Sequence, residues 1–209
     1  LYLSTDGIWD IGDRFLGRKV VSRQLAPGQG YSEELSTVLP AVLPGQYRII
    51  VRTDIYSQIP EADRESNNTA ASAEAFGIRV DEITLGVPFV TSLRAGQERL
   101  VALKVGDDET VRFRLESANP GVANELFVRF GQVPSGAVFD AAYLGAPSSN
   151  LSAILPSTEP GTYYVLIRGY SQPQGTGDVV TTLYTEVLPL AITGIHTDVG
   201  GDTAESTTD

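Results

Sequence analysis

Hydrophobic and polar residues alternate in short runs along much of the chain. The clearest runs are QYRIIVRTD at 46–54, TVRFRLES at 110–117 and ELFVRF at 125–130. Successive side chains of a β-strand point to opposite faces of its sheet, so a run of this kind has one buried and one solvated face. The pattern therefore predicts half-buried strands, with Val111, Phe113 and Leu115 on the buried face of the second run.

Turn-forming residues separate these runs. Pro and Gly occur together in APGQG at 26–30, LPGQ at 43–46 and EPGT at 159–162. No stretch longer than about ten residues shows the period of an amphipathic helix. Short strands joined by Gly/Pro turns are typical of β-sandwiches. We therefore predict an all-β protein of two tandem antiparallel β-sandwiches.

Two segments of the chain share a frame. LPAVLPGQYRIIVR at 39–52 and LPSTEPGTYYVLIR at 155–168 both read LP, three residues, PG, one residue, Tyr, four residues and Arg. In both, Pro-Gly makes a turn that leads into a strand, and Tyr47 or Tyr163 begins its buried face. A tyrosine at such a corner can bury its ring and form a hydrogen bond with a nearby backbone group. This similarity has two alternative explanations, convergent turn chemistry and an ancient duplication.

A change in the pattern near residues 77–85 divides the chain. We expect a first unit at 1–80, a second unit at 81–190, and an acidic linker to a following domain at 191–209. The chain contains no methionine, which indicates an internal fragment of a longer protein or a processed piece.

Composition and charge exclude several classes of function. The formal net charge is −11, and no basic face for the phosphates of nucleic acid or for an anionic membrane is evident. No apolar run approaches the roughly 20 residues that span a bilayer. The chain has no cysteine, and its one histidine, His196, lies in the expected linker. A serine protease-like triad is therefore not expected, and we predict a protein that is not an enzyme.

The first unit carries motifs of a known family. YLSTDGIWDIGDRFLG, LAPGQGY, LPGQYRIIVRTD and EADRESNNT follow one another within residues 1–78. Their order and spacing resemble the bacterial cell-adhesion-related domain, CARDB, which implies an Ig-like sandwich. That family has one or two strands before the YLS motif, so the resemblance implies that this unit is incomplete at its N-terminus.

The second unit resembles another family more loosely. LRAGQERLVALKV, ETVRFRLES, NELFVRFGQVPS and EPGTYYVLIRG at 82–190 are similar to the pre-peptidase C-terminal (PPC) type of jelly-roll-like β-sandwich. Both resemblances imply a non-catalytic structural or adhesion module of a large, repetitive bacterial protein that is secreted or held on the cell surface. The expected partners are neighbouring domains or chains of the same protein.

Two polar segments are candidates for a calcium site. The candidate ligands are Asp6, Asp10 and Asp13 in TDGIWDIGD, and Asp54, Glu61, Glu65 and Asn67 in DIYSQIPEADRESNN. Calcium takes six to eight oxygen ligands, so both segments would have to meet. The spacing is not that of an EF-hand. The alternative is that these side chains form Asx-turns with their own backbone.

Aromatic residues and sheet edges suggest further contacts. Trp9 either caps the end of a core or stacks on a sugar or a partner surface. Tyr164 is expected to face away from the core beside Tyr163, so the second unit is an alternative candidate for carbohydrate binding. An open edge of the first unit is expected to accept a strand from a neighbouring chain.

Overall fold

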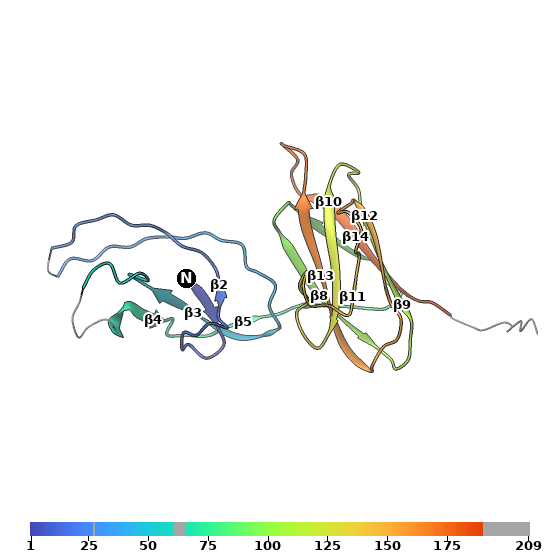
Figure 1. The fold of residues 1–209 in the computed structure, drawn as a ribbon, viewed down its shortest axis with the longest axis horizontal. Helices are drawn as coiled ribbons and strands as arrows, with labels where there is room; N and C mark the ends of the chain where they lie inside the picture. Colours follow the sequence, from blue (N-terminus) through green and yellow to red (C-terminus); the bar gives the residue numbers. More distant parts are fainter. Residues whose placement is uncertain (27, 61–65, 190–209) are drawn as a thin grey trace, which may run out of the picture.

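The computed structural model describes residues 1–26, 28–60 and 66–189 (Figure 1). These ranges contain strands, turns and one 3₁₀ turn at 66–68, and no α-helix. The predicted all-β class is confirmed. Within the same ranges, no helix has the length and apolar character needed to cross a membrane.

The first unit is a small antiparallel sheet. Its strands are β1 (Tyr2–Ser4), β2 (Arg14–Phe15), β3 (Gly45–Arg52), β4 (Thr69–Ala71) and β5 (Phe76–Ile78). The order is β2-β1-β3-β4, with β5 also paired to β3. Leu3, Val42 and Tyr47 form its small buried cluster. The described residues of this unit thus form one sheet, where the sequence predicts the two layers of an Ig-like sandwich.

The chain between β2 and β3 forms an extended arm instead of a second layer. Its two limbs run beside each other, above β3 and β4 in the view of Figure 1. Side chains hold the limbs together, because Lys19 and Arg23 both pair with Glu33, at 2.6 and 2.7 Å. The described residues of the arm contain no strand, so the limbs are not joined by a backbone ladder.

The second unit is a two-layer sandwich. One sheet has the order β11-β10-β13-β8-β6, and the other has the order β12-β9-β14-β7. The strands are β6 (Asp81–Ile83), β7 (Phe89–Leu93), β8 (Glu98–Val105), β9 (Val111–Ser117), β10 (Ala123–Phe130), β11 (Ala141–Ala142), β12 (Asn150–Leu155), β13 (Gly161–Ser171) and β14 (Val179–Val187). Every pairing is antiparallel except that of β6 with β8, which is parallel.

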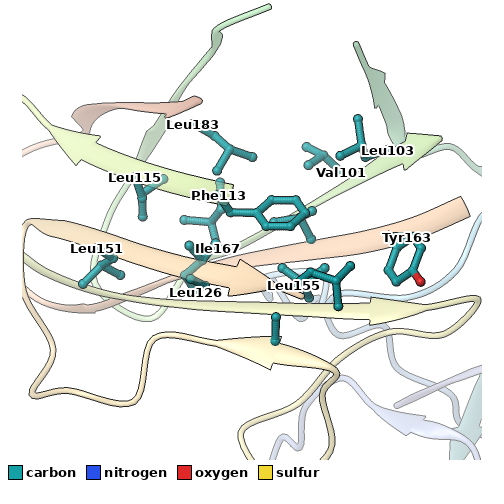
Figure 2. Close-up of a cluster of buried hydrophobic side chains, with 14 of the residues drawn as sticks. Val101, Leu103, Phe113, Leu115, Leu126, Leu151, Leu155, Tyr163, Ile167 and Leu183 are labelled. Carbon is teal, nitrogen blue, oxygen red and sulfur yellow. The ribbon is translucent and has the colours of Figure 1, made fainter. Parts of the chain in front are cut away.

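The main core lies between these two sheets (Figure 2). Val111, Phe113 and Leu115 of β9 are fully buried, as their alternation with arginine and glutamate predicts. They meet Val101 and Leu103 of β8 from the opposite sheet. Burial of such side chains contributes about 1.5–3 kcal/mol each, so this core is the main source of stability.

The two tyrosines of the shared frame occupy equivalent corners. Tyr47 and Tyr163 are both buried near the start of a strand, after a Pro-Gly turn. The Tyr47 hydroxyl donates to the carbonyl of Leu43 at 2.8 Å. The Tyr163 hydroxyl accepts the NH of Glu159 at 3.0 Å. In each case the partner lies four residues earlier, so the predicted corner contact is confirmed at both sites.

Candidate functional site

A surface cleft lies where the two units meet. It has a volume of about 500 Å³ and is lined by residues of the first unit and by the outer face of the β8–β13 sheet of the second. Its charged side chains are Asp6, Asp10, Asp13, Arg14, Glu98 and Arg168. The predicted acidic loop at 5–13 therefore lies on the first-unit side of this cleft.

The carboxylates of that loop are held by its own backbone. Asp6 accepts the NH of Ile8 at 2.8 Å, and Asp10 accepts the NH of Gly12 at 2.6 Å. Asp13 accepts the NH of Asp10 at 3.1 Å. The contacts of Asp6 and Asp10 are those of Asx-turns, the alternative to metal binding that the sequence left open, and Asp13 closes the loop back onto Asp10.

Asp6 has an additional partner beneath the loop. The hydroxyl of Ser4, which is buried, donates to the carboxylate of Asp6 at 3.0 Å. The NH of Ile8 and the hydroxyl of Ser4 both favour the charged form, so they hold the pKa of Asp6 below its ordinary value. Asp6 is thus an ionised acceptor that fixes the start of the loop.

Trp9 packs back onto the sheet. The guanidinium of Arg52 lies 3.6 Å from the centre of its ring, and the ring of Tyr2 approaches it edge-on at 6.2 Å. Trp9 remains 37% exposed. These contacts are those expected of a residue that caps the end of a core, and one face of the ring is occupied by Arg52.

The second candidate segment, which begins at Asp54, leaves the sheet at the opposite end of β3 from the start of the loop at 5–13. The loop at 5–13 begins after Ser4, which pairs with Arg48, and β1 runs antiparallel to β3. Asp54 follows the opposite end of β3 and accepts the NH groups of Gln58 and Ile59 at 2.8 and 2.9 Å.

The remaining candidate ligands do not complete a site in the described residues. Asn67 lies in the 3₁₀ turn at 66–68, whereas Glu61 and Glu65 fall outside the described residues. Among the residues that the structure describes, no three His, Cys, Asp or Glu side chains are grouped as metal ligands. Calcium binding stays a prediction.

An ion-pair cluster joins the two units at the edge of the cleft. Glu98 of β8 accepts the NH of Ala41 from the first unit at 2.9 Å, through Oε2. Its Oε1 lies 2.9 Å from Nη2 of Arg168 in β13. Arg168 also pairs with Glu125 of β10 at 3.1 Å. Glu98 is therefore a direct polar link between the second unit and a backbone group of the first.

An apolar cluster continues this junction. Leu100, Phe127 and Leu166 are buried on the outer face of their sheet, together with Ala41 of the first unit. Val133 and Phe139 from the loop after β10 pack against them. This junction was missed at the level of sequence. The available signal was the near-continuous apolar runs LVAL and YVLI, because a strand that is buried on both faces loses its alternation.

The adjacent tyrosines Tyr163 and Tyr164 of β13 point to opposite faces of the sheet, as predicted. Tyr163 is in the core, and Tyr164 points to the opposite face, where it packs against the apolar cluster of the junction. Tyr170 is 59% exposed. The half-buried ring of Tyr164 offers less surface for stacking than the sequence led us to expect.

Comparisons with known proteins do not place the chain in a family. No family model matches it, and no curated protein is significantly similar to it. The resemblance of residues 1–78 to CARDB stays an interpretation of sequence motifs.

Solved structures that are similar to about half of the chain include three with low sequence identity. One is the pre-peptidase C-terminal domain of a collagenase from Bacillus anthracis, which is 17% identical and has a TM-score of 0.41 over 51% of this chain and 94% of that one. CorA, a surface-associated copper-binding protein of Methylomicrobium album BG8, is 8% identical, with a TM-score of 0.39 over 52% and 98%.

The third is PliG of Aeromonas hydrophila, a periplasmic inhibitor of g-type lysozyme. It is 13% identical and has a TM-score of 0.37 over 53% of this chain and 100% of that one. Similarities this low carry no information about ligand, activity or partner.

Proposed function

We propose that this protein is a non-catalytic structural module of an exported bacterial surface protein, in which two β-units are held in a fixed arrangement and contact neighbouring chains through sheet edges and loop ends. The observation that carries the proposal is the junction between the units. A peptide connection alone would leave two adjacent domains free to reorient. Here, contacts distant in sequence add to that connection.

The junction combines polar and apolar contacts. The NH of Ala41 is bound by Glu98, a residue 57 positions away in the sequence. Ala41 is also buried beside Leu100 and Leu166. Burial of apolar surface around a satisfied hydrogen bond favours a single arrangement, because reorientation would expose the surface and leave the NH unpaired.

A distance measurement within the chain tests this arrangement. Because the natural sequence has no cysteine, Ala70→Cys on β4 and Ser152→Cys on β12 give one exposed label site in each unit. Spin labels at these sites should give a single narrow distance distribution by pulsed electron paramagnetic resonance. Addition of Glu98→Ala should broaden that distribution.

A matched variant serves as the control. Glu82→Ala removes a pair with Lys104 that is largely exposed and lies on the same sheet, and it should leave the distribution narrow. A broad distribution in the natural background would show that the units reorient freely, and it would rule out the fixed arrangement.

Extracellular location and adhesion rest on the sequence resemblances. The absence of cysteine and the net charge of −11 agree with an exported bacterial protein that meets cations rather than nucleic acid.

The alternative function is carbohydrate binding by the second unit, where Tyr164 and Tyr170 lie on or beside one sheet face. Glycan-array binding that is lost in Tyr170→Ala or Tyr164→Ala would favour that alternative over a purely structural role.

A further inference from the structure

Most edge strands of this protein are short or charged. β11 has two residues, β2 has two, and β4 and β5 have three each. β6, at the edge of the larger sheet, carries Asp81 and Glu82. Short strands and charged residues are the usual means by which an edge is protected from pairing with another chain.

The other sheet of the second unit has two longer edges without charge. β7 reads FVTSL and β12 reads NLSAIL. The start of β12 is partly covered, because a backbone bridge between Asn124 and Ser148 joins the preceding chain to β10. β7 pairs with β14 in an unbroken register from Phe89 to Leu93, and among the described residues it has no strand on its other side.

The surface beside β7 is apolar as well as uncharged. Val90 is 62% exposed, and Val87 and Val180 are at least half exposed. Arg94, the residue after β7, is paired with Asp178. Arg99, whose guanidinium lies 5.9 Å from the centre of the Phe89 ring, is paired with Asp81. Val, Phe and Thr are residues that favour strands. β7 is therefore an edge strand without charged residues, it has no strand partner on its outer side among the described residues, and the arginines near it are neutralised by aspartates.

We propose that β7 pairs antiparallel with β7 of a second copy of this chain, about a two-fold axis at Thr91. This pairing would join two four-stranded sheets into one of eight strands. It deepens the proposed function and rests on it, since it names the edge and the partner through which the module contacts its neighbours.

The sequence of β7 is self-complementary in this register. Phe89 lies opposite Leu93 of the second copy, Val90 lies opposite Ser92, and Thr91 lies opposite its own counterpart. Aromatic, β-branched and hydroxyl pairs of these kinds stabilise antiparallel strands, and no like charges meet. Pro88 precedes the strand, so the ladder is limited to the five residues of β7. An isologous contact of this type closes at a dimer.

Charge substitutions at two exposed positions test the register. Val90 and Ser92 face solvent, so V90K/S92K and V90E/S92E leave the core intact. Each double variant puts like charges directly opposite each other in the proposed dimer. An equimolar mixture of the two variants places lysine opposite glutamate at both positions.

The assay is sedimentation equilibrium of the full chain at concentrations up to about 1 mM, which reaches the weak affinities of small contacts. The natural protein should form a reversible dimer. Each charged variant should dimerise at least about tenfold more weakly, because two like-charged pairs are introduced. The mixture should regain dimerisation, and this recovery would also show that both variants are folded.

The other uncharged edge provides the control. S152K/I154K places the same charges on β12, at positions that also face solvent, and should leave the dimer unchanged. Loss of association in this variant would indicate β7–β12 pairing and would overturn the proposal. A natural protein that stays monomeric, or charged variants that still dimerise, would overturn it too. The spin-label distance measured in V90K/S92K tests the fixed arrangement separately, since that distance lies within one chain.

Discussion

Replacement of Glu98 by alanine should destabilise the junction between the units. In the natural protein, Oε2 of Glu98 accepts the NH of Ala41 at 2.9 Å, and Oε1 lies 3.0 Å from Nε of Arg168. Glu98→Ala removes both interactions and leaves the buried NH of Ala41 without its acceptor.

The expected loss follows from these two contacts. A buried NH that loses its partner costs about 1–3 kcal/mol. The ion pair adds only about 0.2–1 kcal/mol, because the side chain of Arg168 is 33% exposed and keeps its contact with Glu125. The free energy of unfolding should therefore fall by about 2 kcal/mol. For a chain of this size, that change lowers Tm by about 4–8 °C.

Urea unfolding and thermal unfolding of matched variants provide the measurement. Glu82→Ala, which removes an exposed pair with Lys104 at 3.2 Å, should change stability little. Glu98→Gln retains an oxygen that can accept the NH of Ala41, so its loss should fall between those of the other two variants. If Glu98→Ala proved no more destabilising than Glu82→Ala, the reasoning that the junction depends on Glu98 would be wrong.

Four further results are expected. Tyr163→Phe should lower the free energy of unfolding by about 1 kcal/mol, measured in urea, because the NH of Glu159 loses its acceptor. Thr185→Val should raise Tm, since the buried hydroxyl of Thr185 has no hydrogen-bond partner within the described structure; an unchanged or lower Tm would contradict this. The pKa of Asp6, followed by carboxyl NMR, should lie below that of an unstructured aspartate and rise in Ser4→Ala; its contribution to stability is full above the unfolded pKa and is lost as the pH falls through the lower folded pKa. Calcium at 100 times its Kd should stabilise the fold by about 2.7 kcal/mol if the predicted site exists, and an identical Tm in millimolar calcium and in chelator, both in the natural protein and in Asp6→Ala, would refute that site.

Alternation and corner motifs were sufficient to predict much of the second unit. β9 has its apolar residues on one face because arginine and glutamate occupy the other, and Val111, Phe113 and Leu115 are all buried. The two Pro-Gly-X-Tyr corners were also predictable, because each depends on contacts within five residues. Features of this kind are determined locally, so a single sequence is enough to reveal them.

The junction and the first unit depended on contacts that alternation does not encode. Ala41 meets Glu98 across 57 positions, and no local pattern marks that pair. Among the described residues, the two limbs of the arm between β2 and β3 are joined by Lys19, Arg23 and Glu33 and not by strand pairing. A strand needs a neighbour, and the sequence predicts the pattern of a strand without predicting that neighbour. The acidic loop likewise had two chemically reasonable interpretations, and its Asx-turn contacts became visible only in the structure.

The position of the junction also determines how a pulling force would travel through the molecule. The peptide connection enters the second unit at β6, an edge strand that pairs with β8 over three residues. Glu98 and Arg168 lie on β8 and β13, the inner strands of the same sheet. Tension applied to the first unit would therefore reach these inner strands directly through Ala41, in parallel with the peptide connection. The three-residue ladder of β6 would not bear the load alone, and early detachment of that edge would be resisted for as long as the contact between Ala41 and Glu98 persists.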